Sequence, residues 1–184
     1  MRRVLRFSLC LLPLMITSGM FYSVLPIYIS KELGASETIV GSLFTVGALT
    51  GAIVSVGVGK ISDRFGRKRT IVLSKICFGL VVLMYSIITD YMFAYPIHVL
   101  EGFAWAMVGV SAPAYISELS EKRGESLGVY NTVVHVGWVI GPIFGGLLAE
   151  TFGFRFMLRI AFILIIFGIL AVLRIEEFRC VQRM

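Results

Sequence analysis

Charged residues are scarce in this sequence. They make up 15% of the 184 residues, whereas 58% are hydrophobic, and the mean hydropathy is +0.91. An ordinary soluble domain carries roughly 25% charged residues. A soluble core of this size could not enclose so much apolar surface, so the composition excludes a soluble globular protein. It indicates an integral membrane protein.

Cysteine is scarce too, and no pattern of catalytic residues is found. Cys10, Cys77 and Cys180 are odd in number and scattered, which predicts neither a disulfide framework nor a metal site. Spacings typical of Ser/His/Asp catalysis, metal-ligand clusters, phosphate loops and channel filter loops are all missing. We therefore expect no enzyme and no cofactor. The net charge of +6 does not indicate nucleic-acid binding, because the basic residues lie between apolar runs.

Six apolar runs are each long enough to cross a bilayer as a helix, which needs about 20 mainly apolar residues. Transmembrane strands would be alternating segments of about 10 residues. The sequence therefore predicts an all-α, polytopic membrane protein with one six-helix domain over residues 1–184. The first run is too long for a signal peptide and is interpreted as an uncleaved span. The predicted spans are about 7–30, 38–58, 71–89, 92–117, 127–149 and 156–173.

Lysine and arginine are unevenly distributed among the predicted connections. Such residues accumulate in cytoplasmic loops. With the N-terminus in the cytoplasm, the outer loops hold only Lys31 and Arg155, so both termini are predicted to be cytoplasmic, in a plasma membrane. Lys75 and Arg159 are expected to lie near helix ends and to snorkel. The residues assigned to the cytoplasm are Arg2, Arg3, Arg6, Lys60, Arg64, Arg67, Lys68, Arg69, Lys122, Arg123, Arg174, Arg179 and Arg183.

The connection between the second and third spans reads GKISDRFGRKRT. Positive charge alone would make it a topological anchor, but an anchor needs neither Asp63 nor the spaced glycines. Gly59 would allow close approach of another helix, Gly66 would permit a tight reversal with positive φ, and Asp63 would accept hydrogen bonds from a helix N-terminus. The charged residues would bridge to acids such as Glu118 or to anionic lipid. The residues of this pattern are Gly59, Asp63, Arg64, Gly66, Arg67 and Lys68.

This pattern resembles the loop 2–3 signature of the major facilitator superfamily (MFS), for which the resemblance implies a conformational lock on the cytoplasmic side. The fifth span is similar to a signature of the family's drug/proton antiporters, and this reading is favoured over the alternative that its glycines only form a packing seam, as in any helix bundle. Glu118 and Arg123 resemble residues of the family's loop 4–5. The span 5 pattern comprises Gly128, Gly137, Gly141, Pro142, Gly145 and Gly146.

Ionisable residues deep in a membrane are costly, by at least about 2.5–3.5 kcal/mol for Asp, Lys or Arg, and are functional candidates. His98 and Glu101 share a face of the fourth span, which Trp105 continues. On the fifth span Asn131, His135 and Trp138 form a second polar stripe, and the first span supplies Tyr22. These residues predict an aromatic-walled cavity for an organic cation.

Proton coupling is predicted for Glu101, His98 and His135, because histidine titrates near neutral pH. Each could instead be structural, with His98 and Glu101 forming a satisfied pair that pins the fourth and fifth spans together. His98 also stands where the family usually has an arginine, and the first span lacks the acid that many cation exporters use. The coupling could therefore differ from that of the family.

The resemblance covers only the N-terminal half of an MFS protein, since members have two six-helix halves. We expect a small-molecule substrate, a proton, the lipid bilayer and a second six-helix half as partners, the last as a separate chain or as a second copy in a homodimer. A truncated or split gene, or a non-transporting six-helix subunit, is the alternative. Glutamine in place of Glu101 would separate a transporter from such a subunit.

Overall fold

The computed structural model of the chain describes residues 1–175, and every regular element in that range is helical. The predicted all-α class is therefore confirmed. Arg179, Cys180 and Arg183, which entered the sequence analysis, lie outside the described residues. The elements are α1 (Arg2–Lys31), α2 (Glu37–Phe65), α3 (Arg67–Tyr85), the 3₁₀ turn η1 (Tyr91–Phe93), α4 (Ala94–Glu118), α5 (Arg123–Phe152) and α6 (Phe154–Leu173).

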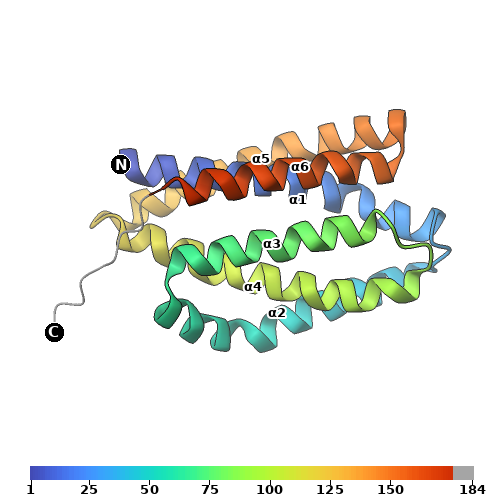
Figure 1. Cartoon of the computed structure of the whole chain (residues 1–184), viewed down its shortest axis with the longest axis horizontal. Helices are drawn as coiled ribbons and strands as arrows, with labels where there is room; N and C mark the ends of the chain where they lie inside the picture. Colours follow the sequence, from blue (N-terminus) through green and yellow to red (C-terminus); the bar gives the residue numbers. More distant parts are fainter. Residues whose placement is uncertain (176–184) are drawn as a thin grey trace.

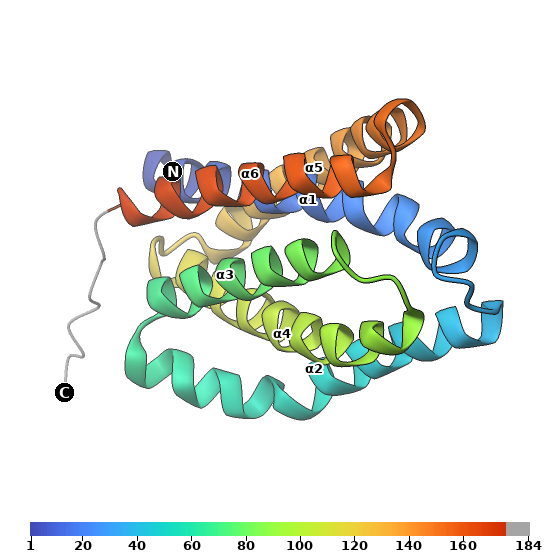
Figure 2. The same cartoon turned by 45° about the vertical axis from the view of Figure 1, so that its right-hand side comes forward.

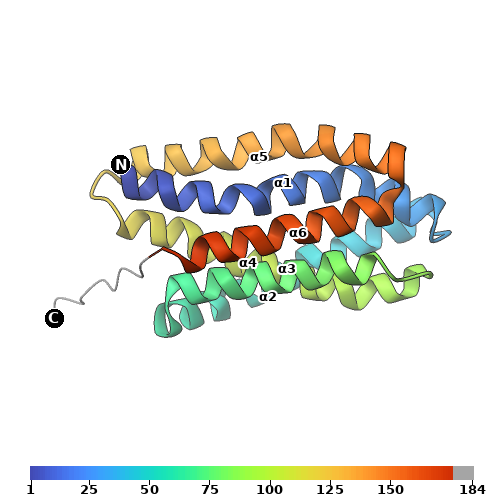
Figure 3. The same ribbon diagram turned by 45° about the horizontal axis from the view of Figure 1, so that its top comes forward.

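The helices form two groups of three (Figures 1 and 2). One group contains α1, α5 and α6, with α1 running between the other two (Figure 3). In the second group, α4 packs against both α2 and α3. The groups meet mainly where α3 packs against α6. Residues far apart in the sequence are thereby brought to a shared interior.

All six helices run roughly antiparallel to their sequence neighbours, so the connections gather at two ends. One end holds the beginning of α1, the α2–α3 and α4–α5 connections and the end of α6 (Figure 1). We call it the basic end, because the described residues that were predicted to be cytoplasmic lie there. Lys31 and Arg155 lie at the opposite end. The fold thus places the basic residues that were predicted to be cytoplasmic at one end of the bundle, and those that were predicted to be outside at the other end.

Five segments are long and apolar enough to cross a membrane, namely α1, α2, η1 with α4, α5 and α6. Helix α3 does not meet that criterion, because it begins with three basic residues and carries Lys75 further along. It ends at Tyr85, short of the predicted end of the third span at residue 89. The six-helix architecture is present in residues 1–175, and five of the helices fit a multi-pass membrane protein by length and composition.

Helix boundaries follow local chemistry. The side chain of Ser36 caps α2 by accepting a hydrogen bond from the backbone N–H of Ile39 at 3.4 Å. Gly66, with φ of 101°, joins α2 directly to α3, and Gly153, with φ of 86°, joins α5 to α6. Residues with side chains rarely adopt such φ values, so glycine permits these abrupt reversals.

Helices α1 and α5 pack backbone against backbone. A Cβ atom on Gly141 would lie 2.8 Å from Gly19 Cα, and one on Gly145 would lie 2.6 Å from Met20 Cα. Gly137 faces Met15 in the same way. The three glycines that recur every four residues therefore form the helix contact that their spacing predicts. A Cβ atom on Gly128 or Gly146, which belong to the same signature, would meet no described residue within 4 Å.

Lys75 contradicts the prediction that its side chain snorkels to the interface. It is fully buried, and its ammonium group donates hydrogen bonds to the backbone carbonyls of Cys10 on α1, at 2.6 Å, and Gly168 on α6, at 2.8 Å. Its Cα lies two turns into α3, roughly 12 Å from Arg67 along the axis. The ammonium group bonds to carbonyls within the bundle and does not extend to the water at the membrane surface. Lys75 therefore joins α3 to α1 and α6.

Candidate functional site

Glu101 lies at the centre of a polar cluster in the interior of the bundle. Its side chain is 5% exposed, and Tyr22 of α1 donates a hydrogen bond to its Oε1. The indole N–H of Trp105, one turn further along α4, donates in turn to the Tyr22 hydroxyl. Helix periodicity places Trp105 and Glu101 on one face of α4, and the α1 backbone brings Tyr22 to that face. The carboxyl group thus has a hydrogen-bonded partner from another helix.

His98 completes the cluster from the other side of Glu101. The ring is fully buried, and its Nδ1 lies against Glu101 Oε2 without the alignment of a hydrogen bond. Its Nε2 has no hydrogen-bond partner among the described residues. The ring is enclosed by Phe44 and Tyr85, with centroid distances of 5.4 and 6.0 Å. His98 therefore faces α2 and α3, not α5, so it does not pin the fourth and fifth spans together.

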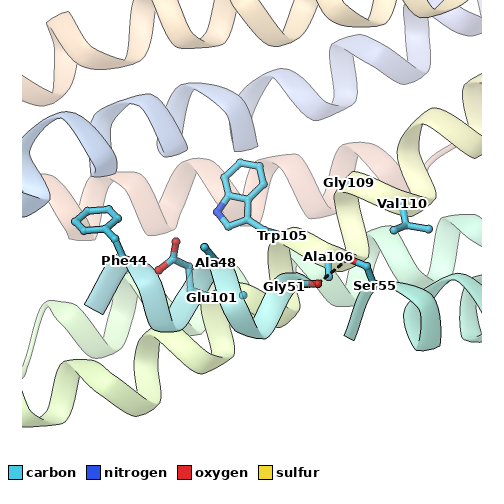
Figure 4. A pocket seen from close by; sticks show the side chains of 11 residues that line it. Phe44, Ala48, Gly51, Ser55, Glu101, Trp105, Ala106, Gly109 and Val110 are labelled. Carbon is cyan, nitrogen blue, oxygen red and sulfur yellow. Dashed lines mark hydrogen bonds between the residues drawn. The ribbon is translucent and has the colours of Figure 1, made fainter. Parts of the chain in front are cut away.

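A pocket of about 510 Å³ opens beside this cluster, between α2 and α4. Figure 4 shows the carboxyl group of Glu101 and the indole ring of Trp105 pointing to the same side of α4. Phe44 lies at the same end of the pocket as Glu101, whereas glycine and alanine line most of the remaining wall. The pocket is predominantly apolar with one carboxyl group, a composition that suits a small organic ligand.

The aromatic residues predicted for the cavity come together around Tyr22. The ring of Trp138 on α5 stacks on Tyr22 at a centroid distance of 5.9 Å and an interplanar angle of 16°. Trp105 lies 6.1 Å from the same ring. Asn131 and His135 are exposed on α5 and make no hydrogen bond or ion pair with described residues. The structure thus joins Tyr22, Trp105 and Trp138 to the Glu101 cluster, but not Asn131 or His135.

The α2–α3 connection forms a polar network at the basic end. Arg67 makes an ion pair with Asp63 and a second with Glu118 at the end of α4, at 3.1 Å. It also donates to the hydroxyl of Ser62 at 3.2 Å. Lys68 donates to the carbonyls that end α6, including that of Leu173 at 3.1 Å. One connection thereby ties the ends of α2, α4 and α6 together.

Three other residues of the predicted loop patterns are less engaged. A Cβ atom on Gly59 would lie 3.8 Å from Val110 Cγ1, an ordinary contact, so no described helix makes the close approach predicted there. The close approach of α2 and α4 occurs instead at Gly102, where a Cβ atom would meet the Gly47 carbonyl oxygen. Arg64 and Arg123 are exposed.

Tyr85 and Phe44 also belong to the site, although no pattern in the sequence indicates them. Tyr85 is fully buried at the end of α3, and its hydroxyl has no hydrogen-bond partner among the described residues. Neither residue lies within one helical turn of another candidate polar residue in its own segment, so nothing there singled them out. Only the packing of α2 and α3 around His98 shows their place.

The fold and the buried polar cluster define a class: a multi-pass helical membrane protein with a carboxyl group and aromatic rings around an internal pocket. The sequence profile described as Major Facilitator Superfamily matches residues 7–179. The chain therefore belongs to the major facilitator superfamily. The family resemblance found in the sequence is confirmed.

Similar proteins of known name share the same stretch. The chain is 28% identical over 166 residues to an uncharacterised MFS-type transporter of Methanocaldococcus jannaschii, covering 89% of this chain and 43% of the relative. It is 32% identical over 152 residues to multidrug resistance protein 1 of Bacillus subtilis, covering 81% and 39%. It is 27% identical over 165 residues to a Na⁺, Li⁺, K⁺/H⁺ antiporter of Planococcus maritimus, covering 86% and 38%. The chain thus spans less than half the length of these relatives.

Proposed function

We propose that this chain forms the N-terminal half of a secondary active transporter that exports a small organic molecule in exchange for protons. The observation that carries the proposal is the buried Glu101 carboxyl group, which receives a hydrogen bond from Tyr22 and lines the pocket between α2 and α4. A buried ionisable residue at membrane depth is costly and is usually retained for function. The names of two relatives, a multidrug resistance protein and a cation/proton antiporter, support this assignment.

Glu101 would bind a proton and a cationic substrate in alternation. In the carboxylate form it attracts an organic cation, which the rings of Tyr22, Trp105 and Trp138 would hold by cation–π contacts. A proton arriving from outside neutralises the carboxylate and releases the substrate. Loss of that proton toward the cytoplasm restores the carboxylate as new substrate binds. Tyr22 orients the carboxyl group, and the His98 ring beside it is a second candidate for proton transfer.

The transporter would be completed by a second six-helix half, as a separate chain or a second copy. Helices α2 and α5 leave long apolar faces uncovered, with Ile53 70% and Val139 67% exposed. Those faces would pack against the second half, and Asp63 would help to close the basic end against it. The basic end, with both termini, would lie in the cytoplasm of a cell whose plasma membrane holds the protein.

Replacement of Glu101 by glutamine tests the proposal. The protein, with whatever chain co-purifies with it, would be reconstituted into liposomes with a pH-sensitive dye inside. Substrate-driven proton movement should fall at least tenfold in Glu101→Gln, because glutamine keeps the shape but cannot exchange a proton. Glu150→Gln is the matched control, since Glu150 is an exposed acid on α5 outside the site. Equal proton movement in Glu101→Gln and the unmodified protein would refute the role of Glu101.

A non-transporting six-helix subunit is the second candidate. It is favoured by the exposed positions of Asn131 and His135, which lie outside the Glu101 cluster although the sequence predicted them for the cavity. In that case neither glutamine variant would change any transport, and the polar cluster would contribute only to stability.

A further inference from the structure

The pocket beside Glu101 extends along the contact between α2 and α4, away from its acidic end. Figure 4 shows Phe44 and Glu101 at one end of the pocket, and Gly109 and Val110 at the other. Glu101 and Val110 are nine residues apart on α4, so the pocket follows the helix for roughly 13 Å. We call the part beyond Trp105 the glycine slot. It is lined by Gly51, Ser55, Ala106, Gly109 and Val110.

The glycine slot is open because small residues face it from both helices. Helices α2 and α4 touch near the acidic end, where a Cβ atom on Gly102 would meet the carbonyl oxygen of Gly47. They approach again at the far end, where a Cβ atom on Gly59 would lie 3.8 Å from Val110 Cγ1. Gly109 is exposed, and an added Cβ atom there would meet no described residue within 4 Å. The slot is therefore a space between two helices that approach each other at both of its ends.

The two ends of the pocket differ in chemistry. At one end, Glu101 is 5% exposed, and its Oε2 has no aligned hydrogen-bond partner among the described residues. In the slot, Ser55 alone among the described lining residues has a polar side chain, and its hydroxyl donates to the Gly51 carbonyl at 2.6 Å. The indole N–H of Trp105, where the slot begins, donates to Tyr22. A ligand therefore meets a carboxylate at one end and a wall without an unoccupied side-chain donor along the rest.

From this arrangement we infer that the substrate is a single-chain amphiphile, with a cationic head at Glu101 and an alkyl tail in the glycine slot. The inference rests on the proposed function, whose substrate class it narrows. The carboxylate attracts the head, and Phe44 and Trp105 line the pocket near it and supply cation–π contacts. The tail lies in the slot because its burial removes apolar surface from water and leaves no hydrogen-bonding group unsatisfied.

The length of the slot sets the length of the tail. An extended chain of about ten carbons spans roughly 12 Å, because each C–C bond of about 1.5 Å advances about 1.25 Å along the zigzag. Glu101 and Gly109 are eight residues apart on α4, which is also roughly 12 Å. Gly109, whose missing side chain leaves the far end open, is therefore a specificity-determining residue for tail length.

Binding of alkyltrimethylammonium ions of increasing chain length tests this inference. The purified protein, with whatever chain co-purifies with it, is titrated in lipid nanodiscs. Tryptophan fluorescence reports binding, and affinities are referred to the free aqueous concentration of each ion. In the unmodified protein the affinity should rise by up to about fourfold per methylene group from butyl to decyl. It should level off beyond decyl, because the slot ends near Val110.

Gly109→Leu should weaken binding of the decyl ion at least tenfold and leave that of the butyl ion nearly unchanged. The leucine side chain would occupy the far end of the slot, which a butyl tail does not reach, and its Cβ atom would meet no described residue within 4 Å. Gly57→Leu is the matched control. Gly57 lies on α2 outside the pocket, and an added Cβ atom there also meets no described residue within 4 Å. The control should leave both affinities unchanged.

Several results would overturn the inference. No loss of decyl binding in Gly109→Leu, an equal loss for the butyl and decyl ions, or an equal loss in the two leucine variants would show that the tail does not lie in the slot. Uncharged decanol that binds as tightly as the decyl ion would assign the slot to a lipid chain. Should Gly109→Leu not fold, the chain-length series decides, because an affinity that still rises from decyl to tetradecyl contradicts a slot that ends near Val110.

Failure of this inference can be distinguished from failure of the proposed function. Binding in nanodiscs needs no proton gradient, so the chain-length pattern does not depend on proton exchange at Glu101. Proton movement that persists in Glu101→Gln, together with the expected chain-length pattern, would refute proton coupling and retain the tail site. Proton movement that depends on Glu101, without that pattern, would refute only the tail site.

Discussion

At the scale of single residues, two buried ionisable groups have different roles in the bundle. Glu101 lines a pocket and has partners that come from side chains, Tyr22 and His98. Lys75 is fully buried, and its partners are the backbone carbonyls of Cys10 and Gly168. Side-chain partners can rearrange with a ligand, whereas backbone carbonyls of packed helices cannot. Glu101 is therefore the functional candidate, and Lys75 is a structural link.

Lys75→Met should destabilise the protein. Methionine fills similar space but donates no hydrogen bond, so two buried carbonyls lose their extra partner, at a cost of about 1–3 kcal/mol each. The expected result is a clearly lower melting temperature in detergent, followed by tryptophan fluorescence. Lys60→Met, at an exposed position of α2, is the control and should melt like the unmodified protein. A Lys75→Met protein with unchanged melting would contradict the link between α1, α3 and α6.

At the scale of helices, the contact between α1 and α5 depends on the absence of side chains. Gly137, Gly141 and Gly145 meet the α1 backbone at distances that leave no room for a Cβ atom. Close backbone contact of this kind provides van der Waals attraction where lipid removes the hydrophobic driving force between helices. The seam also sets the height of Trp138 relative to Tyr22, and so it positions one wall of the site.

Gly141→Ala should therefore separate α1 from α5. The new methyl group would meet the carbonyl oxygen of Ile16 and would lie 2.8 Å from Gly19 Cα, and overpacking of this kind costs about 1–3 kcal/mol. We expect a lower melting temperature. We also expect the fluorescence of Trp138 to be quenched less, because its ring would lie further from that of Tyr22. Gly146→Ala is the matched control on the same helix, since nothing lies within 4 Å of its added atom. The seam would lose its proposed importance if both variants melted alike.

At the scale of the whole molecule, the uncovered faces of α2 and α5 require an explanation. Large apolar side chains such as Ile53, Val56 and Val139 are 67% exposed or more. Lipid could cover them, but the relatives are more than twice as long as the matched stretch of this chain. A second set of helices on these faces would also enclose the pocket beside Glu101.

The native mass of the tagged chain, extracted in mild detergent, tests this arrangement. We expect a particle of twice the chain mass of 20.4 kDa, or a complex with a second six-helix polypeptide. Crosslinks between cysteines placed at positions 53 and 139 of adjoining chains would locate the contact. A monomer without a partner would contradict the proposed two-half transporter and favour a non-transporting subunit.

Much of the candidate site was accessible from spacing along single helices. The His98, Glu101 and Trp105 face follows from helix periodicity, and the α5 seam follows from its four-residue repeat. The meeting of Tyr22 with Glu101 could not be predicted in this way, because it depends on how α1 lies against α4. His135 was predicted as a proton-coupling candidate together with His98, yet it lies exposed on α5 while His98 is fully buried.

The sequence by itself determined that this is an all-α membrane protein, the family to which it belongs and the ends at which its charges gather. The class and the charge distribution follow from the composition and periodicity of local segments, since each apolar run must satisfy its own backbone hydrogen bonds in lipid. The family was indicated by the resemblance of the loop 2–3 and span 5 motifs. Tertiary structure alone decided the partners of Lys75 and the aromatic enclosure of His98. Those contacts join residues from different helices, and their geometry is set by packing that no local pattern records.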